Sequence, residues 1–190
     1  GTFKSKKYKF SSTSTFPLSI NINNLVKSYN LEDVTAFTLI AEGSESRIPT
    51  RVNHQLIYGE VSDKNSLKCS INTSLTNKQA FIPKYKKGFI WGQFINQKNY
   101  DSKIGFCFKS SEGKSEKINI DFYSINGKIK SKNKILNQKK SLIINAKEVL
   151  NSSKKIEMYW YVAKCNRPDL TAYSVHKNKL SGNSSGEHNF

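Results

Sequence analysis

The sequence predicts an all-β fold: an antiparallel β-sandwich of the jelly-roll kind with one or two short helices, with a closed β-barrel as the alternative. Three observations predict it. Short apolar or alternating runs recur along the chain, polar turn-forming stretches such as AEGSES, VSDKNS and SSEGKS separate them, and helical periodicity is scarce. At 190 residues the chain is long enough for one domain with a sizeable core.

The strand-like runs follow one another at short intervals. In KINIDFYSI, Ile118, Ile120 and Phe122 fall on one face, as the period of two in a half-buried strand requires. The pair Asn126-Gly127 behind them is the strongest hairpin signal in the sequence. The runs that we expect to form strands are 14–20, 35–41, 51–58, 67–75, 88–95, 103–109, 117–125, 141–145, 156–164 and 170–176.

Helical signals are confined to two short segments. Residues 22–37 have room for one helix with Asn23 or Asn24 as its N-cap, and residues 145–150 have room for a single turn. Neither segment is long enough to organise a core, so the strands must do so.

The densest basic stretch, GKIKSKNKILNQKK, covers residues 127–140. We expect it to be a lysine-rich connection or an edge strand, because lysines on edge strands protect a sheet from aggregation. We expect residues 2–190 to form a single domain. Its ends, 2–13 and 178–190, are expected to be flexible, since the first is basic and Ser/Thr-rich and the second is a Gly/Ser/Asn-rich coil.

The composition predicts attraction to anionic partners. The formal net charge is +17 and the pI is about 9.8, which favours contact with nucleic acid, anionic lipid or acidic glycans. A general bias towards lysine and asparagine would raise the charge without any selection for binding. No apolar run approaches the roughly 18 residues of a membrane span. Thr2 follows Gly1 with no initiator methionine, which favours a processed, secreted or cell-surface protein.

The three cysteines do not predict a metal or disulfide framework. Cys69, Cys107 and Cys165 are widely spaced, and no pair forms a CxxC motif. Each lies in an apolar or alternating run that is typical of a buried thiol, and one disulfide among them is the open alternative. Phosphate-binding loops, dinucleotide fingerprints and GxSxG motifs are absent from the sequence. We therefore expect no cofactor and no metal.

Arginine is rare and clustered in this sequence. Two of the three arginines, Arg47 and Arg51, lie in RIPTRVNH, and the other basic residues are almost all lysine. A guanidinium forks onto carboxylates, phosphates and sulfates, so an arginine in a lysine-rich chain indicates a position where lysine does not suffice. In a continuous strand the two would share a face about 13 Å apart, at roughly 3.3 Å per residue. Pro49 instead favours a loop that enters a strand.

The third arginine, Arg167, follows the aromatic run EMYWYVAK at a predicted turn. Polar residues in loops at strand ends commonly form binding sites. A structural role is the alternative, in which Arg167 pairs with Asp169 or Glu157 and Arg47 pairs with Glu45. The residues around this turn that we assign to the same site are Asn166, Asp169, Tyr173 and His176.

The histidines do not form a zinc signature. His54, His176 and His188 are far apart in the sequence, and neither HxH nor HExxH occurs. An enzyme that acts on a glycan, with His54 or His176 as acid or base, is the second candidate function. It requires one of these histidines to lie within hydrogen-bonding reach of a carboxylate inside a cleft.

Two segments, FIPKYKKGFIWGQF and EMYWYVAK, interleave aromatic and basic residues. Sugars lie against aromatic rings through their C–H faces, and nucleobases stack on them, so a non-specific nucleic-acid binder is the third candidate. Motifs of nucleic-acid-binding domains are absent from the sequence. In MYWYV, Tyr159 and Tyr161 share one face and Trp160 occupies the other, so one of the two sets must be core.

We therefore predict a non-catalytic β-sandwich module that binds a polar or anionic ligand, with a glycan as the leading candidate. Arginine forks would bind an acidic group, and Trp91 or Tyr173 would stack on the ligand. The site requires residues 47–54 and 166–176 to meet in space. The predicted ligand-binding residues are Arg47, Arg51, Asn53, His54, Trp91, Asn166, Arg167, Asp169, Tyr173 and His176.

Overall fold

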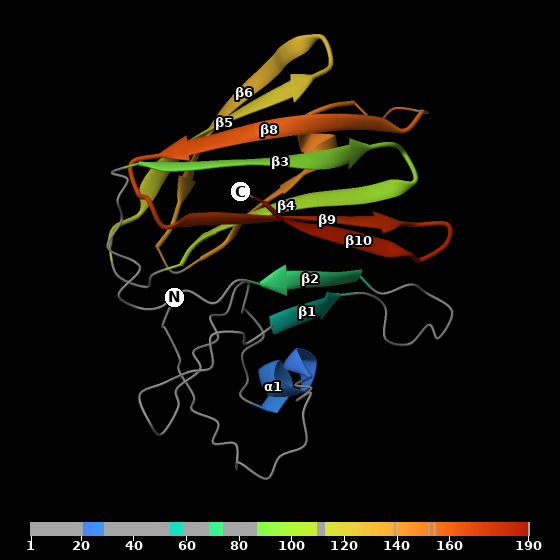
Figure 1. Ribbon diagram of the computed structural model, residues 1–190, viewed down its shortest axis with the longest axis horizontal. Helices are drawn as coiled ribbons and strands as arrows, with labels where there is room; N and C mark the ends of the chain where they lie inside the picture. Colours follow the sequence, from blue (N-terminus) through green and yellow to red (C-terminus); the bar gives the residue numbers. More distant parts are fainter. Residues whose placement is uncertain are drawn as a thin grey trace.

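The computed structural model describes residues 21–28, 54–58, 69–73, 87–109, 113–138, 140–151, 153 and 155–189. Their strands form two antiparallel four-stranded sheets and one two-stranded hairpin (Figure 1). The prediction of an all-β sandwich is confirmed. The alternative of a closed barrel is wrong, because the sheets formed by the described residues are open.

Each four-stranded sheet mixes strands from distant parts of the chain. The first sheet contains, in spatial order, β3 (Gly88–Asn96), β8 (Glu157–Cys165), β5 (Glu116–Ser124) and β6 (Gly127–Leu136). The second contains β10 (Ser184–Asn189), β9 (Leu170–Asn178), β4 (Tyr100–Phe108) and β7 (Leu142–Asn145). The separate hairpin pairs β1 (His54–Tyr58) with β2 (Cys69–Thr73), and β2 lies beside β10 (Figure 1).

The core lies between the two sheets and follows from strand alternation. Buried residues alternate with more exposed ones along most of β3, β4, β5, β8 and β9, so one side of each strand faces the core. Ile118, Ile120 and Phe122 are fully buried, as KINIDFYSI predicts. Tyr161 is likewise buried whereas Trp160 is exposed, so the alternation in MYWYV also places the core as expected. Phe94 packs edge-to-face on Phe122 and so joins β3 to β5.

The helical segments are short, as the sequence predicts. The helix α1 (Ile22–Ser28) begins after Asn21, whose side-chain oxygen accepts a hydrogen bond from the backbone N–H of Asn24 at 3.2 Å. The prediction of Asn23 or Asn24 as the cap is therefore wrong by two or three positions. A single 3-10 turn, η2 (Ala146–Glu148), forms within the predicted segment 145–150. Neither helix is long and apolar enough to cross a membrane.

Two strands differ from the sequence-based expectation. The C-terminal coil prediction is wrong over Ser184–Asn189, which pairs along its whole length with β9. The lysine-rich stretch forms β6, an edge strand joined to β5 by the predicted hairpin, in which Gly127 has φ 110°. The expected strands 14–20 and 35–41 lie outside the described residues.

Most of the β6 lysines are engaged within the protein. Lys130 Nζ donates to the Val149 carbonyl at 3.2 Å, and Lys132 Nζ donates to the Glu148 carbonyl at 2.8 Å. These carbonyls end the 3-10 turn, where a cation is favourable. The basic stretch therefore serves a structural purpose in these two cases, independent of any anionic partner.

A buried polar cluster joins the two sheets near β10. The amide of Asn189 donates to the Tyr161 hydroxyl at 2.5 Å and to the Ser174 hydroxyl at 2.8 Å. The side chain of Asn189 lies against the backbone of Gly92, where an added Cβ would stand 2.5 Å from its Cγ and Oδ1. Glycine at position 92 thus makes room for this inter-sheet contact.

Replacing Gly92 with alanine is expected to lower the free energy of unfolding by about 2 kcal/mol, because the new methyl group displaces a buried, hydrogen-bonded amide. Chemical denaturation measures this loss. Gly105→Ala is the matched control, since nothing lies within 4 Å of a Cβ added to that strand residue. Equal stability of the two variants would contradict the packing described for Asn189.

Candidate ligand-binding face

The first half of the predicted site lies mostly outside the described residues. Arg47, Arg51 and Asn53 fall in that part of the chain, and only the backbone of His54 is described, at the start of β1. In Figure 1, β1 lies on the far side of β2 from β10, and β10 in turn separates β2 from β9. The ligand role of residues 47–54 stays a prediction.

Arg167 forks onto a carboxylate, but that carboxylate belongs to the protein. Its Nε donates to Asp169 Oδ1 at 3.0 Å and its Nη2 donates to Asp169 Oδ2 at 2.7 Å. Nη1 donates to the Lys114 carbonyl at 2.8 Å, and the guanidinium lies 3.8 Å from the centre of the Phe108 ring. This is the structural alternative raised by the sequence, and it ties the β8–β9 turn to the loop before β5.

The neighbouring glycine shows how closely that loop approaches. Gly113 has φ +106°, and an added Cβ would stand 2.8 Å from Nη1 of Arg167. Asn166, in the same turn, is exposed and donates to the Glu116 carboxylate at 3.2 Å. The polar side chains of this turn therefore bind one another and the loop before β5, and they stabilise this end of the sandwich.

His176 lies between the sheets. It is 5% exposed, and burial lowers its pKa to about 4, so the imidazole is neutral at pH 7. Its Nδ1 has no hydrogen-bond partner among the described residues, and Ser102, which has a similarly unpaired hydroxyl, stands directly opposite on β4. The described surroundings therefore do not provide the carboxylate partner in a cleft that an acid or base role requires.

The two predicted stacking residues lie on opposite outer faces. Trp91 is on β3 and points outward from the first sheet, whereas Tyr173 is on β9 and points outward from the second. A single small ligand cannot contact both. Of the predicted residues with described side chains, only Asn166, Arg167 and Asp169 are brought together, at the β8–β9 turn.

The thiols and acids do not suggest a metal centre or a nucleophile. Cys107 and Cys165 are free thiols, and burial raises the pKa of Cys107 to about 11 and also raises that of Cys165. Among the described residues, no group of three or more His, Cys, Asp or Glu side chains is arranged to hold a metal ion.

The outer face of the first sheet carries exposed aromatic residues on adjacent strands. Trp91 is 46% exposed and Phe89 is 58% exposed, both on β3, and Trp160 on β8 is 36% exposed. Trp91 pairs with Val162 and Trp160 pairs with Gln93, so the two tryptophans are diagonal neighbours, and residues in such pairs lie about 7–8 Å apart. We call this surface the aromatic face; its residues are Phe89, Trp91, Trp160, Tyr123, Asp121, Asn119, Asn133 and Lys164.

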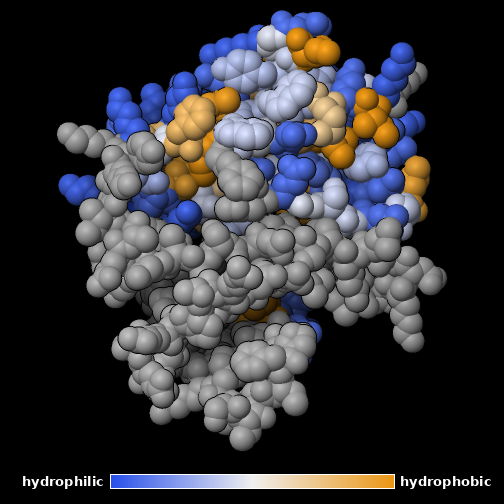
Figure 2. Space-filling view, in the orientation of Figure 1, coloured by the Kyte–Doolittle hydropathy of each residue, from blue (hydrophilic) through white to orange (hydrophobic). Residues whose placement is uncertain are grey.

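Polar groups lie beside the aromatic rings on this face. Asp121 stands across from Val162, and its Oδ1 accepts hydrogen bonds from Ser131 at 2.6 Å and from Lys128 at 2.7 Å. The bond from Lys128 is the main cause that lowers the pKa of Asp121, so this carboxylate stays ionised. Asn119 donates to Asn133 at 3.1 Å on the neighbouring strands. Figure 2 shows hydrophobic side chains scattered among hydrophilic ones over the upper part of the molecule.

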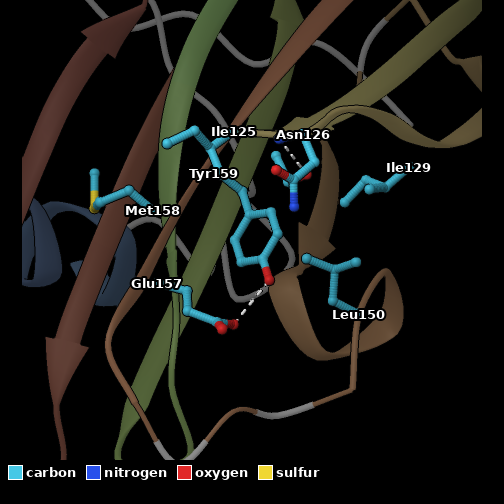
Figure 3. Close-up of a pocket in the computed structure, with 8 residues that line it drawn as sticks. Ile125, Asn126, Ile129, Leu150, Glu157, Met158 and Tyr159 are labelled. Carbon is cyan, nitrogen blue, oxygen red and sulfur yellow. Dashed lines mark hydrogen bonds between the residues drawn. The ribbon is translucent and has the colours of Figure 1, made fainter.

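A hollow of about 270 Å³ lies at the end of the same sheet, between the β5–β6 hairpin and the start of β8 (Figure 3). The Tyr159 ring occupies its middle and stacks on Phe94, and the Tyr159 hydroxyl donates to Glu157 at 2.8 Å. Apolar side chains form much of the wall. The lining residues are Ser124, Ile125, Asn126, Ile129, Leu150, Glu157, Met158 and Tyr159.

The sequence pattern indicates Trp91 as a ligand-binding residue but not its partners on the aromatic face. Trp160 is recognisable as the outward residue of MYWYV, yet only the pairing of β3 with β8 places it beside Trp91. Asp121 is the outward residue in a clean strand pattern, a position that alone does not distinguish a ligand contact from a solvated charge. The sequence contains no local signal for the hollow, because distant segments form it.

Comparison with known proteins does not add a relative. No protein-family model, no curated protein and no solved structure matches this chain.

Proposed function

We propose that the protein is a non-catalytic β-sandwich module that binds a glycan on the aromatic face. The observation that carries the proposal is the diagonal placement of Trp91 and Trp160, both exposed, on adjacent strands of one sheet. Large exposed apolar groups that gather on one face commonly mark an interaction site. A sheet holds these side chains in fixed positions before the ligand binds. Little binding free energy is therefore lost in ordering them.

The polar groups beside the tryptophans suit sugar hydroxyls. Asn133 is exposed, and the amides of Asn119 and Asn133 both donate and accept hydrogen bonds. The Asp121 carboxylate is 8% exposed and holds Ser131 and Lys128 in place beside them. The rings present flat apolar surfaces to the C–H faces of a sugar, while the polar groups orient its hydroxyls. Binding sites for small ligands commonly have this composition, in which a few polar groups fix the orientation of the ligand on an apolar surface.

The same arrangement argues against the nucleic-acid alternative at this face. Phosphates need basic groups that are available beside the stacking rings. Lys128 instead binds Asp121 at 2.7 Å, so the charge of this lysine is already balanced by a carboxylate. Lys164 stands 5.9 Å from the centre of the Phe89 ring. The proposal therefore keeps the glycan predicted from the sequence and moves its site from the arginines to the aromatic face.

Substituting Trp91 with alanine is expected to weaken oligosaccharide binding at least tenfold, the effect of losing about 1.4 kcal/mol of binding free energy. Trp160→Ala is expected to act in the same direction. Isothermal titration calorimetry against neutral and acidic oligosaccharides measures both losses.

Ile143→Ala is the matched control for these variants. Ile143 is 49% exposed, close to the exposure of Trp91, but it lies on β7 in the second sheet. This variant is expected to bind like the unchanged protein. The proposal fails if no oligosaccharide binds, or if Ile143→Ala weakens binding as much as Trp91→Ala does.

A further inference from the structure

Four aromatic rings form one row across the aromatic face. Tyr123 on β5 stands directly opposite Trp160 on β8. Trp160 is the diagonal neighbour of Trp91 on β3, and Phe89 lies two residues from Trp91 on the same side of that strand. Each ring therefore has the next one as its neighbour, from Tyr123 at one end to Phe89 at the other. We call these four residues the aromatic row.

Strand pairing fixes the spacing of the aromatic row. The register joins β3 to β8 over nine residue pairs and β8 to β5 over five, so the backbones that carry the rings do not slide past one another. At one end, the Lys164 ammonium lies 5.9 Å from the centre of the Phe89 ring. The sheet thus determines the length and the path of a ligand that contacts every ring.

The aromatic row is longer than one sugar unit. Trp160 pairs with Gln93, which is four residues from Phe89 on β3, and Tyr123 lies two strands away from β3. With strands about 4.8 Å apart and roughly 3.3 Å per residue, the ends of the row are about 16 Å apart. A pyranose ring is about the size of a phenyl ring, so several successive sugar units are needed to cover the row.

Polar side chains border the aromatic row on both sides. Gln93, opposite Trp160, lies on one side. Lys164 pairs with Phe89 on one neighbouring strand and with Asn119 on the other, so these two polar residues lie on the other side. Their amide and ammonium groups donate hydrogen bonds to hydroxyl oxygens. A ligand that matches this pattern has apolar faces and hydroxyls along both edges.

We propose that the aromatic row binds several successive units of a linear β-1,4-linked glycan, an inference that rests on the proposed function. In β-1,4-linked glucose all ring substituents are equatorial, so C–H groups form the faces, hydroxyls line both edges and the chain stays extended. Successive units stack on successive rings from Tyr123 to Phe89. Affinity therefore depends on chain length, because each further unit covers a further part of the row.

Calorimetric titration of the full chain with β-1,4-linked glucose oligosaccharides, from the disaccharide to the hexasaccharide, tests this inference. We expect affinity to rise with length until the row is covered, so that the hexasaccharide binds about tenfold more tightly than the disaccharide. Equal affinity for both would overturn the inference and leave the proposed function standing. An absence of binding at every length would also overturn it, whereas the proposed function fails only if the other neutral and acidic oligosaccharides do not bind either.

A substitution at the end of the row tests the path of the chain. Phe89 is 58% exposed, so Phe89→Ala leaves the core intact. This variant is expected to weaken binding of the hexasaccharide about threefold or more, and binding of the disaccharide less, because the disaccharide has the other rings of the row available.

Ile135→Ala is the matched control for this substitution. Ile135 is 68% exposed on the outer face of the same sheet, but it lies on β6, away from the aromatic row. Its removal is expected to leave the affinity for the hexasaccharide unchanged. An equal loss for both sugar lengths in Phe89→Ala, or an equal loss in Ile135→Ala, would contradict the proposed path of the chain.

Discussion

Replacement of Arg167 by alanine is expected to lower the free energy of unfolding by about 3 kcal/mol. The Arg167 and Asp169 side chains are each 13% exposed, so the substitution leaves a carboxylate that is largely buried and has lost both of its guanidinium hydrogen bonds. The ring of Phe108 and the Lys114 carbonyl lose their contacts with the guanidinium as well. Urea denaturation at pH 7 measures the change.

A double-mutant cycle with Asp169→Ala separates the pair from the other contacts. The doubly substituted protein is expected to be more stable than the sum of the two single losses implies, because it does not leave one member of the ion pair behind without the other. Oligosaccharide affinity is expected to stay unchanged in Arg167→Ala at temperatures where the variant is folded. A large loss of affinity with little loss of stability would contradict this structural role of Arg167. It would indicate instead that Arg167 contacts the ligand.

Acidification is expected to destabilise the protein through His176, by about 3 kcal/mol between pH 7 and pH 4. The unfolded state binds the imidazole proton near pH 6.5, whereas burial lowers the pKa in the folded state to about 4. Between these values the unfolded state binds more protons, so stability rises with pH. Above pH 6.5 the histidine is neutral in both states and does not lower the free energy of unfolding. As the pH falls from 6.5 to about 4, protonation of the unfolded state lowers the free energy of unfolding.

His176→Gln isolates this contribution from those of the carboxylates, because glutamine stays neutral over the whole range. The difference in unfolding free energy between the two proteins, measured by urea denaturation at steps from pH 7.5 to 4, is expected to shift by about 3 kcal/mol in favour of the variant. A difference that does not vary with pH would mean that the histidine is not buried in the folded protein.

The fold was predictable because strand alternation is local. The pattern in KINIDFYSI directly assigns Ile118, Ile120 and Phe122 to the core, and the Asn126-Gly127 pair marks the hairpin. Ser184–Asn189 was missed because it has almost no apolar residues. It forms an edge strand through backbone pairing with β9, and its buried Asn189 side chain is held by hydrogen bonds.

The site was less predictable because it depends on which strands pair. The rarity of arginine correctly indicated that Arg167 uses its fork, but the sequence left open whether a ligand or Asp169 receives it. Trp91 was predicted as a stacking residue from a segment that interleaves aromatic and basic residues, whereas its neighbour Trp160 is brought to it by long-range pairing. No periodicity in a single strand encodes that register.

The most direct test of the proposed glycan-binding face is a fluorescence titration of the unmodified protein. The chain has two tryptophans, and both lie on the aromatic face, so intrinsic tryptophan emission reports on that surface alone. Oligosaccharides that stack on the rings are expected to shift the emission to shorter wavelength in a saturable manner, since they exclude water from Trp91 and Trp160. Saturable binding in calorimetry with no change in emission would place the ligand elsewhere and contradict the account.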